Sequence, residues 1–148
     1  MLRVTRLTDY ATVVLTVLSA RPDDVLSAAD LAAAAGLELP TVAKVLRALA
    51  QAGLVEGFRG AGGGYRLARD PAEITLAQVV SAVDGPIVVG DFGEPHQDGA
   101  CDHEGQCVLL AVWADAGRHM RRLLEGRTLA DVAAITRGEA AWPEPAPR

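Results

Sequence analysis

The amino-acid sequence predicts a mainly α-helical fold with one small β-hairpin and a long helix toward the C-terminal end. Three observations support this fold class. Apolar residues recur at three- and four-residue steps in several segments, a glycine-rich turn separates two short strand-like runs, and one late segment repeats its apolar residues near the heptad interval. With 148 residues, half of which are apolar, the chain is long enough to bury a sizeable core.

Three helices are expected near the N-terminal end. Apolar residues at helical spacing predict the first helix over residues 5–20, and Pro22 ends it. Ser27 is placed to cap a second, alanine-rich helix that stops at Gly36. A third helix over residues 40–52 begins with a proline, whose missing amide hydrogen would have no partner in the first turn of a helix.

A hairpin and a fourth helix are expected next. Residues 54–58 and 65–68 predict two strands joined by the glycine-rich turn at residues 60–64, and residues 74–83 predict a helix. A short helix, a tight turn, a second helix and then a glycine-rich hairpin is the order typical of a winged helix-turn-helix DNA-binding module. We therefore predict a winged helix-turn-helix domain over residues 1–85.

The C-terminal part is predicted to contain a loop, two helices and a tail. Residues 86–107 form a cysteine-containing loop, which we interpret as a sensor loop. Residues 108–135 comprise a long dimerisation helix and a short C-terminal helix, and the proline-containing tail at residues 136–148 is expected to be disordered. The apolar residues of the long helix that recur near the heptad interval are Leu109, Val112, Trp113, Ala116, Met120 and Leu123.

Charge is distributed unevenly along the chain. The net charge of -5 is unusual for a protein that binds a polyanion, but residues 1–69 carry eight basic residues against six acidic ones. The predicted DNA-binding half is thus slightly basic. We expect weak non-specific binding to double-stranded DNA, which depends on a dimer to double the contacts.

Other partners and activities are not predicted. The sequence has no uncharged apolar run long enough to span a membrane, and its N-terminal segment lacks the layout of a signal peptide. We therefore expect a cytoplasmic protein with no membrane partner and no small-molecule substrate. No nucleophile, base and orienting group occur together in a catalytic motif, so we do not expect an enzyme.

The residues expected to contact DNA lie on the third helix and in the hairpin. A recognition helix enters the major groove only if its exposed face lacks bulk, and Lys44 and Arg47 add cationic donors for bases and phosphates. A glycine-rich tip can approach the sugar-phosphate backbone closely, and Arg59 beside it suits a narrow minor groove. The alternatives are a solvated helix face and a flexible surface turn. The predicted DNA-contacting residues are Pro40, Thr41, Lys44, Arg47, Arg59, Gly60, Gly62, Gly63, Gly64 and Tyr65.

Four short motifs occur in a fixed order along the chain. They are Leu-Thr-Asp-Tyr-Ala at residues 7–11, Arg-Gly-Ala-Gly-Gly-Gly-Tyr-Arg-Leu at residues 59–67, Ala-Val-Asp-Gly-Pro at residues 82–86, and Cys107 six residues before Trp113. Together they resemble the Rrf2 family of bacterial regulators over residues 1–135, and most closely its branch that controls iron-sulfur cluster assembly through the SUF system. The resemblance implies a homodimeric winged-helix regulator, which often carries a 2Fe-2S or 4Fe-4S cluster in the loop before the dimerisation helix.

The resemblance also implies ligands for a cluster, with two departures from the family pattern. One is Leu110, which stands where some relatives carry a histidine ligand. Cys101 and Cys107 match the second and third of three family cysteines, whereas Phe92 stands where the first is expected. Imidazole and carboxylate can replace thiolate on iron, and the expected cofactor is an iron-sulfur cluster of the 2Fe-2S type. The alternatives are a thiol redox site, another metal site, or inert loop cysteines. The candidate substitutes for the two missing ligands are His96, His103 and the partner subunit's Asp9.

With the resemblance included, the sequence predicts a homodimeric transcriptional regulator that acts as a repressor. Its target genes would serve iron-sulfur cluster assembly or a related stress response, and its affinity for DNA would follow the state of the cluster. Two alternatives stay open. One is a cluster-free family member that binds DNA constitutively or through another ligand, and the other is a winged-helix module used for protein contacts.

Overall fold

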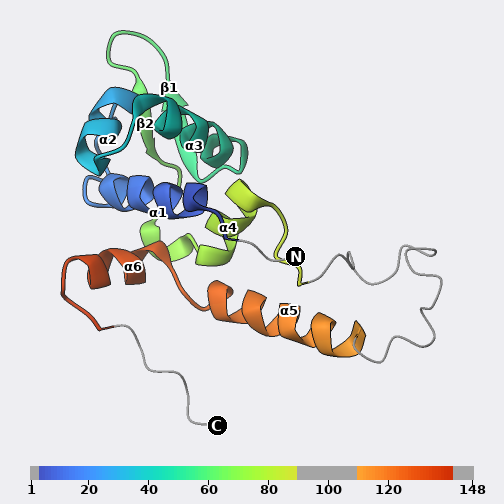
Figure 1. The fold of residues 1–148 in the computed structure, drawn as a ribbon. Helices are drawn as coiled ribbons and strands as arrows, with labels where there is room; N and C mark the ends of the chain where they lie inside the picture. The colour runs from blue at the N-terminus through green and yellow to red at the C-terminus, as the bar shows by residue number, and fades with distance from the viewer. Residues whose placement is uncertain (1–3, 90–109, 142–148) are drawn as a thin grey trace.

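The computed structural model describes residues 4–89 and 110–141, and these residues have the predicted fold class. Six α-helices, one short 3-10 helix and one two-stranded hairpin make up the regular elements of the described part (Figure 1). The elements are α1 (Arg6–Ser19), α2 (Ala28–Ala35), α3 (Leu39–Gln51), β1 (Val55–Phe58), β2 (Gly64–Leu67), the 3-10 helix η1 (Pro71–Glu73), α4 (Leu76–Asp84), α5 (Leu110–Glu125) and α6 (Leu129–Thr136).

Some observed boundaries differ from the predicted ones for local reasons. Helix α3 begins at Leu39, so Pro40 occupies the second helical position, where the amide hydrogen that proline lacks would still have no partner within the helix. Helix α4 begins at Leu76 instead of residue 74 because Thr75 caps it through a capping box. The short helix η1 has no counterpart in the prediction.

Helices α2 and α3 form the helix-turn-helix. Ser27 caps α2, because its Oγ accepts a hydrogen bond from the Asp30 amide at 3.1 Å while the Asp30 carboxylate accepts from the Ser27 amide. Gly36 ends α2 with φ of 65°, in the left-handed region that favours glycine. This turn lets α3 begin almost at once, as the sequence predicts.

The hairpin is attached to the chain segment before α2. Strands β1 and β2 pair antiparallel, from Val55 opposite Leu67 to Phe58 opposite Gly64. Tyr65 on β2 also exchanges two backbone hydrogen bonds with Leu26, at 2.7 and 3.0 Å. The hairpin is therefore held on its second side by a short third strand-like segment.

Helix α1 lies at the centre of the body. Figure 1 shows α2, α3 and the hairpin on one side of α1 and α6 on the other, with α4 packed against both α1 and α3. Burying a large aliphatic side chain stabilises a fold by about 1.5–3 kcal/mol, so the recognition helix and the wing are positioned by one shared core. The largest fully buried side chains are those of Leu15, Leu18, Leu31, Leu46, Leu49, Leu54, Ile74, Leu129, Val14, Val42, Val45 and Val79.

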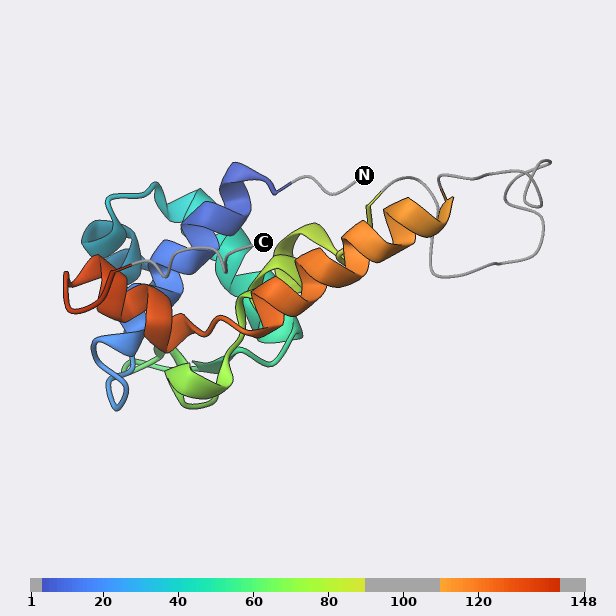
Figure 2. The same cartoon turned by 90° about the horizontal axis from the view of Figure 1, so that it is seen from below.

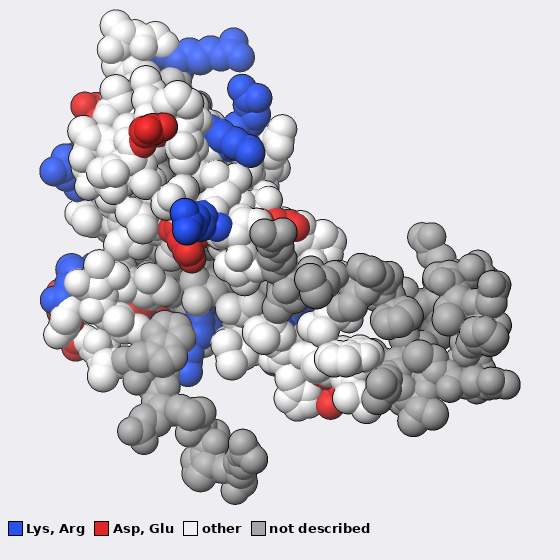
Figure 3. Space-filling view, viewed as in Figure 1, with Lys and Arg blue, Asp and Glu red and all other residues white. Residues whose placement is uncertain are grey.

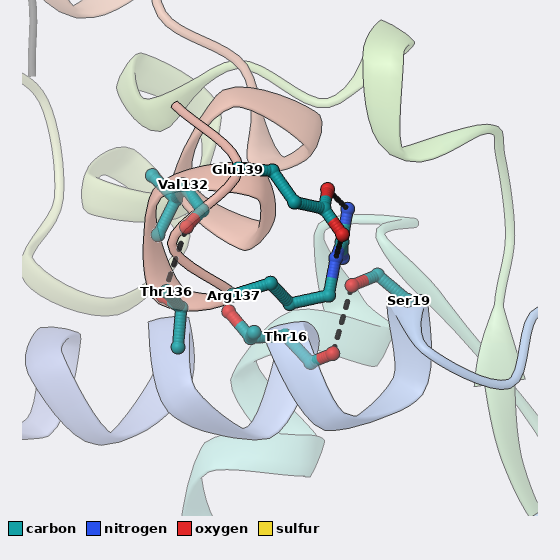
Figure 4. Close-up of polar contacts among 6 residues, drawn as sticks. All are labelled: Thr16, Ser19, Val132, Thr136, Arg137 and Glu139. Carbon is teal, nitrogen blue, oxygen red and sulfur yellow. Dashed lines mark hydrogen bonds and ion pairs between the residues drawn. The ribbon is translucent and has the colours of Figure 1, made fainter. Parts of the chain in front are cut away.

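Helix α6 returns to this body and packs against α1. Leu129 is fully buried in the main core, and its amide donates to the Ile74 carbonyl at 2.8 Å. Figure 4 shows the C-terminal end of α6 beside Thr16 of α1, where Arg137 and Glu139 form two hydrogen bonds of 2.8 Å with each other. The C-terminal helix therefore shares the core of the N-terminal helices.

Helix α5 extends outward from the body, past α4 (Figure 2). It packs through Leu124 against a small apolar cluster that contains Ala77, Val80 and Ile87. In the described ranges no helix has the length and apolar character needed to cross a membrane. The exposed large apolar residues of α5 are Val112, Trp113, Met120 and Leu123.

Candidate nucleic-acid interface

Helix α3 buries one face in the core and exposes the other. Pro40, Lys44 and Arg47 are exposed, whereas Thr41 is half-buried at the edge of this surface. Neither Lys44 nor Arg47 forms a hydrogen bond or an ion pair with another described residue. Two cationic groups on the predicted recognition helix are thus unpaired within the described part of the chain. The buried face consists of Val42, Val45, Leu46 and Leu49.

The tip of the hairpin carries one exposed arginine beside two glycines that have open space around them. Arg59 follows β1 directly and has no polar partner among the described residues. Gly60 has φ of 99°, and its carbonyl accepts a hydrogen bond from the Gly63 amide at 3.0 Å, which closes the turn. No atom lies within 4 Å of the position that a Cβ would take at Gly60 or Gly62. The tip therefore has open space around it.

The other two glycines of the wing have a structural role. A Cβ at Gly63 would stand 2.5 Å from the Phe58 carbonyl oxygen, and a Cβ at Gly64 would stand 2.5 Å from the Leu26 carbonyl carbon. Real Cβ atoms do not approach backbone so closely. From the sequence, Gly63 and Gly64 are predicted to contact DNA. In the structure, their close packing against backbone is enough to explain why glycine stands at both positions. Their contact with DNA stays a prediction.

Tyr65 and Arg66 lie on β2 and interact within the hairpin. Tyr65 is half-buried and packs against the main core. The Arg66 guanidinium lies 3.4 Å from the Glu56 carboxylate and 5.0 Å from the centre of the Phe58 ring. These contacts distinguish Arg66 from the unpaired Arg59. That Tyr65 contacts DNA also stays a prediction.

Basic side chains gather at one end of the molecule. Figure 3 shows Lys and Arg side chains projecting at the end formed by the hairpin and the neighbouring part of α3. Helix α5 lies at the other end in the same view (Figure 1). Because a polyanion is attracted to clustered cations, this end is the candidate interface for nucleic acid.

Asp84 joins the end of α4 to the start of α1. Its carboxylate accepts hydrogen bonds from the Thr5 amide at 2.9 Å, the Thr5 hydroxyl at 2.7 Å and the Thr8 hydroxyl at 2.7 Å. Partial burial raises the pKa of Asp84, but the hydrogen bonds from Thr5 and Thr8 outweigh it and hold the pKa below its ordinary value. Sequence reasoning singled out the segment Ala82–Pro86 as a motif and missed this carboxylate as the acceptor for Thr5 and Thr8 at the start of α1.

Replacing Asp84 by alanine is expected to lower the free energy of unfolding by about 2 kcal/mol at pH 7, because the first turn of α1 loses its acceptor. The folded-state pKa lies below the unfolded one, so the contribution of the carboxylate is present at neutral pH and is lost as the pH falls through the folded pKa. Urea titrations at pH 7 and at pH 3, at fixed protein concentration, measure the difference between wild type and variant. That difference should shrink at the lower pH.

The matched control is Asp23→Ala, because Asp23 is an exposed carboxylate in the turn after α1. This variant is expected to unfold like the wild type at both pH values. An equal loss of stability for Asp84→Ala at pH 7 and pH 3 would show that the charge of Asp84 does not matter. No loss at pH 7 would show that the cap is not needed.

The segment after α4 is also attached to α5. The Arg121 guanidinium donates to the Ile87 carbonyl at 3.3 Å, and Ile87 is buried beside Leu124. Val89 packs closely on Gly117, where an added Cβ would stand 3.6 Å from the Val89 amide nitrogen. The few residues from Asp84 to Val89 therefore link α1 at one end to α5 at the other.

Most of the predicted metal ligands lie outside the described residues. Cys101, Cys107, His96 and His103 belong to residues 90–109, and Phe92 does as well. Asp9 is described, and it is exposed in the first turn of α1. Among residues 4–89 and 110–141, no three His, Cys, Asp or Glu side chains gather in a way that could hold a metal ion.

The fold and this surface together define a winged helix-turn-helix protein. A family model described as Rrf2, iron-dependent transcriptional regulator, matches residues 4–135, and the chain belongs to the Rrf2 family. This confirms the predicted family. The family model describes transcriptional regulators and not enzymes, which agrees with the prediction from the sequence.

Three similar proteins illustrate the relationship. BadM of Rhodopseudomonas palustris, named as an HTH-type transcriptional regulator, is 40% identical over 99 residues, which are 66% of this chain and 60% of BadM. The HTH-type transcriptional regulator IscR of Aliivibrio salmonicida is 33% identical over 104 residues, which are 70% of this chain and 60% of IscR. The match thus spans about three fifths of the length of these relatives.

The third similar protein is a solved structure, that of CymR, the global cysteine regulator of B. subtilis. It superposes with a TM-score of 0.69 over 91% of this chain and 98% of CymR. The two sequences are 24% identical, so the likeness concerns the fold. It confirms the predicted winged-helix fold with a long helix beyond the wing.

Proposed function

We propose that this chain is a homodimeric transcriptional repressor that binds double-stranded DNA with α3 in the major groove and the wing in the minor groove. One observation carries the proposal. Lys44 and Arg47 are unpaired cations of α3, and α3 packs against β1, which Arg59 and the glycine tip directly follow. Family membership supports this assignment. We also propose that the protein acts in the cytoplasm, where the DNA that it regulates would lie.

The groove contacts follow from the side chains available. Lys44 and Arg47 donate to base edges or phosphates, because a guanidinium pairs with the acceptors of guanine in the major groove. Arg59 enters the minor groove, where a narrow groove concentrates negative potential. The open tip at Gly60 and Gly62 lets backbone amides approach a phosphate.

The dimer forms through the apolar face of α5. Trp113 is 43% exposed and Leu123 is 57% exposed, although both are large apolar side chains. Together with Val112, Ala116 and Met120 they recur near the heptad interval and form one stripe. A second copy of the helix would cover this stripe, and the dimer would place two recognition helices on two half-sites.

We also propose that an iron-sulfur cluster of the 2Fe-2S type controls the affinity for DNA. Two thiols, Cys101 and Cys107, and two imidazoles, His96 and His103, make a donor set that such a cluster accepts, since Rieske-type centres combine the same groups. The partner subunit's Asp9 is a further candidate, and its exposure leaves it accessible. The signal that changes the affinity for DNA would be a change in the redox state of a bound cluster or the loss of its iron.

The residues that flank the loop give this signal a route to the DNA-binding surface. Asp84 is held by Thr5, which precedes α1, and by Thr8 of α1, and this helix packs against α3. Ile87 is held by Arg121 of α5. A change in the loop would therefore alter the angle between α5 and the body, and with it the spacing of the two recognition helices. We propose genes of iron-sulfur cluster assembly or a related stress response as the targets.

Replacing Arg59 by alanine is expected to weaken DNA binding by about tenfold or more and to reduce the salt dependence of binding. Fluorescence anisotropy with DNA from upstream of the chain's own gene, at several salt concentrations, measures both. Arg122→Ala is the matched control, because it removes an exposed arginine side chain from α5, which lies at the other end of the molecule. Equal behaviour of the two variants would contradict the role of Arg59.

Purification without oxygen tests the cofactor. The expected product is coloured and holds iron, and Cys101→Ser and Cys107→Ser should each lose both the visible absorption and the iron. A colourless, iron-free wild-type protein would contradict the cluster. That result would favour the second candidate, a cluster-free family member, for which Phe92 at the position of a family cysteine is the supporting observation.

A further inference from the structure

Leu39 is a large apolar residue at the start of α3 that the fold does not use. Its side chain is 48% exposed, although it stands at the first position of the helix. The exposed apolar residues of α5 form one stripe, and Phe58 has the Arg66 guanidinium over one face of its ring. Leu39 belongs to neither group.

The position of Leu39 on α3 gives it a second apolar neighbour. Ala43 follows one turn later and is exposed, and Arg47 follows after another turn. The exposed side of α3 therefore begins apolar and becomes basic. In helix-turn-helix proteins the N-terminal residues of the recognition helix are the ones that contact base edges.

The charges around Leu39 disfavour a phosphate as its neighbour. The exposed Glu38 carboxylate directly precedes it, and residues 36–43 contain no lysine or arginine. Pro40 also removes one of the amide donors that the start of a helix would offer to an anion. An apolar surface beside a carboxylate suits the base edges of the groove better than its charged walls.

We propose that Leu39, with Ala43, selects DNA sites by contacting the C5-methyl group of thymine. This methyl is the apolar group that bases present in the major groove, and apolar side chains recognise it there. The inference rests on the proposed DNA-binding function and deepens it. It assigns sequence selection at this position to an apolar contact, in addition to the cationic contacts of Lys44 and Arg47.

The test uses the full chain and a DNA duplex selected by it from a random-sequence pool. Each thymine of the selected site is replaced in turn by deoxyuridine, which lacks the methyl group. At one thymine in each half-site the replacement should weaken binding of the wild type by about three- to fivefold, the value of one buried methyl group. Leu39→Ala should bind the thymine duplex more weakly by a similar factor and should be insensitive to deoxyuridine there.

Val13→Ala is the matched control, because it also shortens an exposed aliphatic side chain, 42% exposed on α1. It should keep both the affinity and the deoxyuridine sensitivity of the wild type. The inference is overturned if Leu39→Ala retains the wild-type sensitivity at every thymine, or if no thymine matters while binding stays salt-sensitive. An absence of salt-sensitive binding to any duplex would overturn the proposed function itself and this inference with it.

Discussion

Alanine at Gly64 is expected to detach the wing and to weaken DNA binding by more than tenfold, while alanine at Gly62 leaves the attachment and the stability of the wing unchanged. A Cβ at Gly64 would stand 2.5 Å from the Leu26 carbonyl carbon and 2.9 Å from the Ser27 amide nitrogen. Both contacts are with backbone, so no side chain can move aside. Strand β2 must therefore move away from the segment of Leu26 and Ser27. The overpacking and the loss of the two hydrogen bonds between Leu26 and Tyr65 together lower the free energy of unfolding by about 3 kcal/mol.

Thermal unfolding and anisotropy titrations measure these two effects. The melting temperature of Gly64→Ala should fall by roughly 10 °C, whereas that of Gly62→Ala should not change, because nothing lies within 4 Å of its added Cβ. The pair matters because both residues lie in the same glycine run. If Gly62→Ala were the more damaging of the two, the run would serve only as a flexible tip.

Glutamate at Leu123 is expected to convert the dimer into a monomer. The side chain is 57% exposed in the single chain, so the substitution should leave the body folded. In a symmetric α5 pair it would bury two like charges without partners, which raises the dissociation constant of the dimer by about a hundredfold or more. DNA binding should weaken with it, because each half-site alone offers few phosphate contacts.

Sedimentation equilibrium measures the oligomeric state directly. Ala114→Glu is the control, because it adds the same charge at an exposed position of α5 that lies off the apolar stripe. It should remain dimeric. A dimeric Leu123→Glu protein would place the interface elsewhere, and a monomeric wild type would remove the dimer from the account.

The arrangement of helices could be predicted because each local signal agrees with the fold around it. Ser27 caps α2 and Gly36 ends it, and in the structure both residues have those roles. The apolar period of α3 likewise matches its buried face. Such signals depend on neighbouring residues along the chain, which the sequence presents directly.

The parts that could not be predicted depend on contacts between distant segments. Nothing local to Asp84 indicates that Thr5 and Thr8 lie against it, since the hydrogen bonds join opposite ends of the N-terminal body. The same holds for Gly64, whose steric neighbour is Leu26. A glycine run predicts a turn, but it does not say which glycine faces solvent and which faces backbone.

The candidate site was predicted unevenly for a related reason. The outer face of α3 follows from its helical period, so the exposure of Lys44 and Arg47 could be anticipated. The exposure of Leu39 could not be anticipated, because a large apolar residue is expected to be buried. The proposed cluster ligands depend on family resemblance and on residues 90–109, and they stay predictions.

The most direct test of the central claim is the salt dependence of DNA binding by the full chain. The affinity for DNA from upstream of its own gene is measured between about 50 and 200 mM salt. A dimer with the proposed contacts of α3 and the wing should show a steep linear fall of log affinity with log salt, with a loss of about a thousandfold over this range. Affinity that does not change with salt, or no binding at all, would contradict the account and favour a winged-helix module for protein contacts.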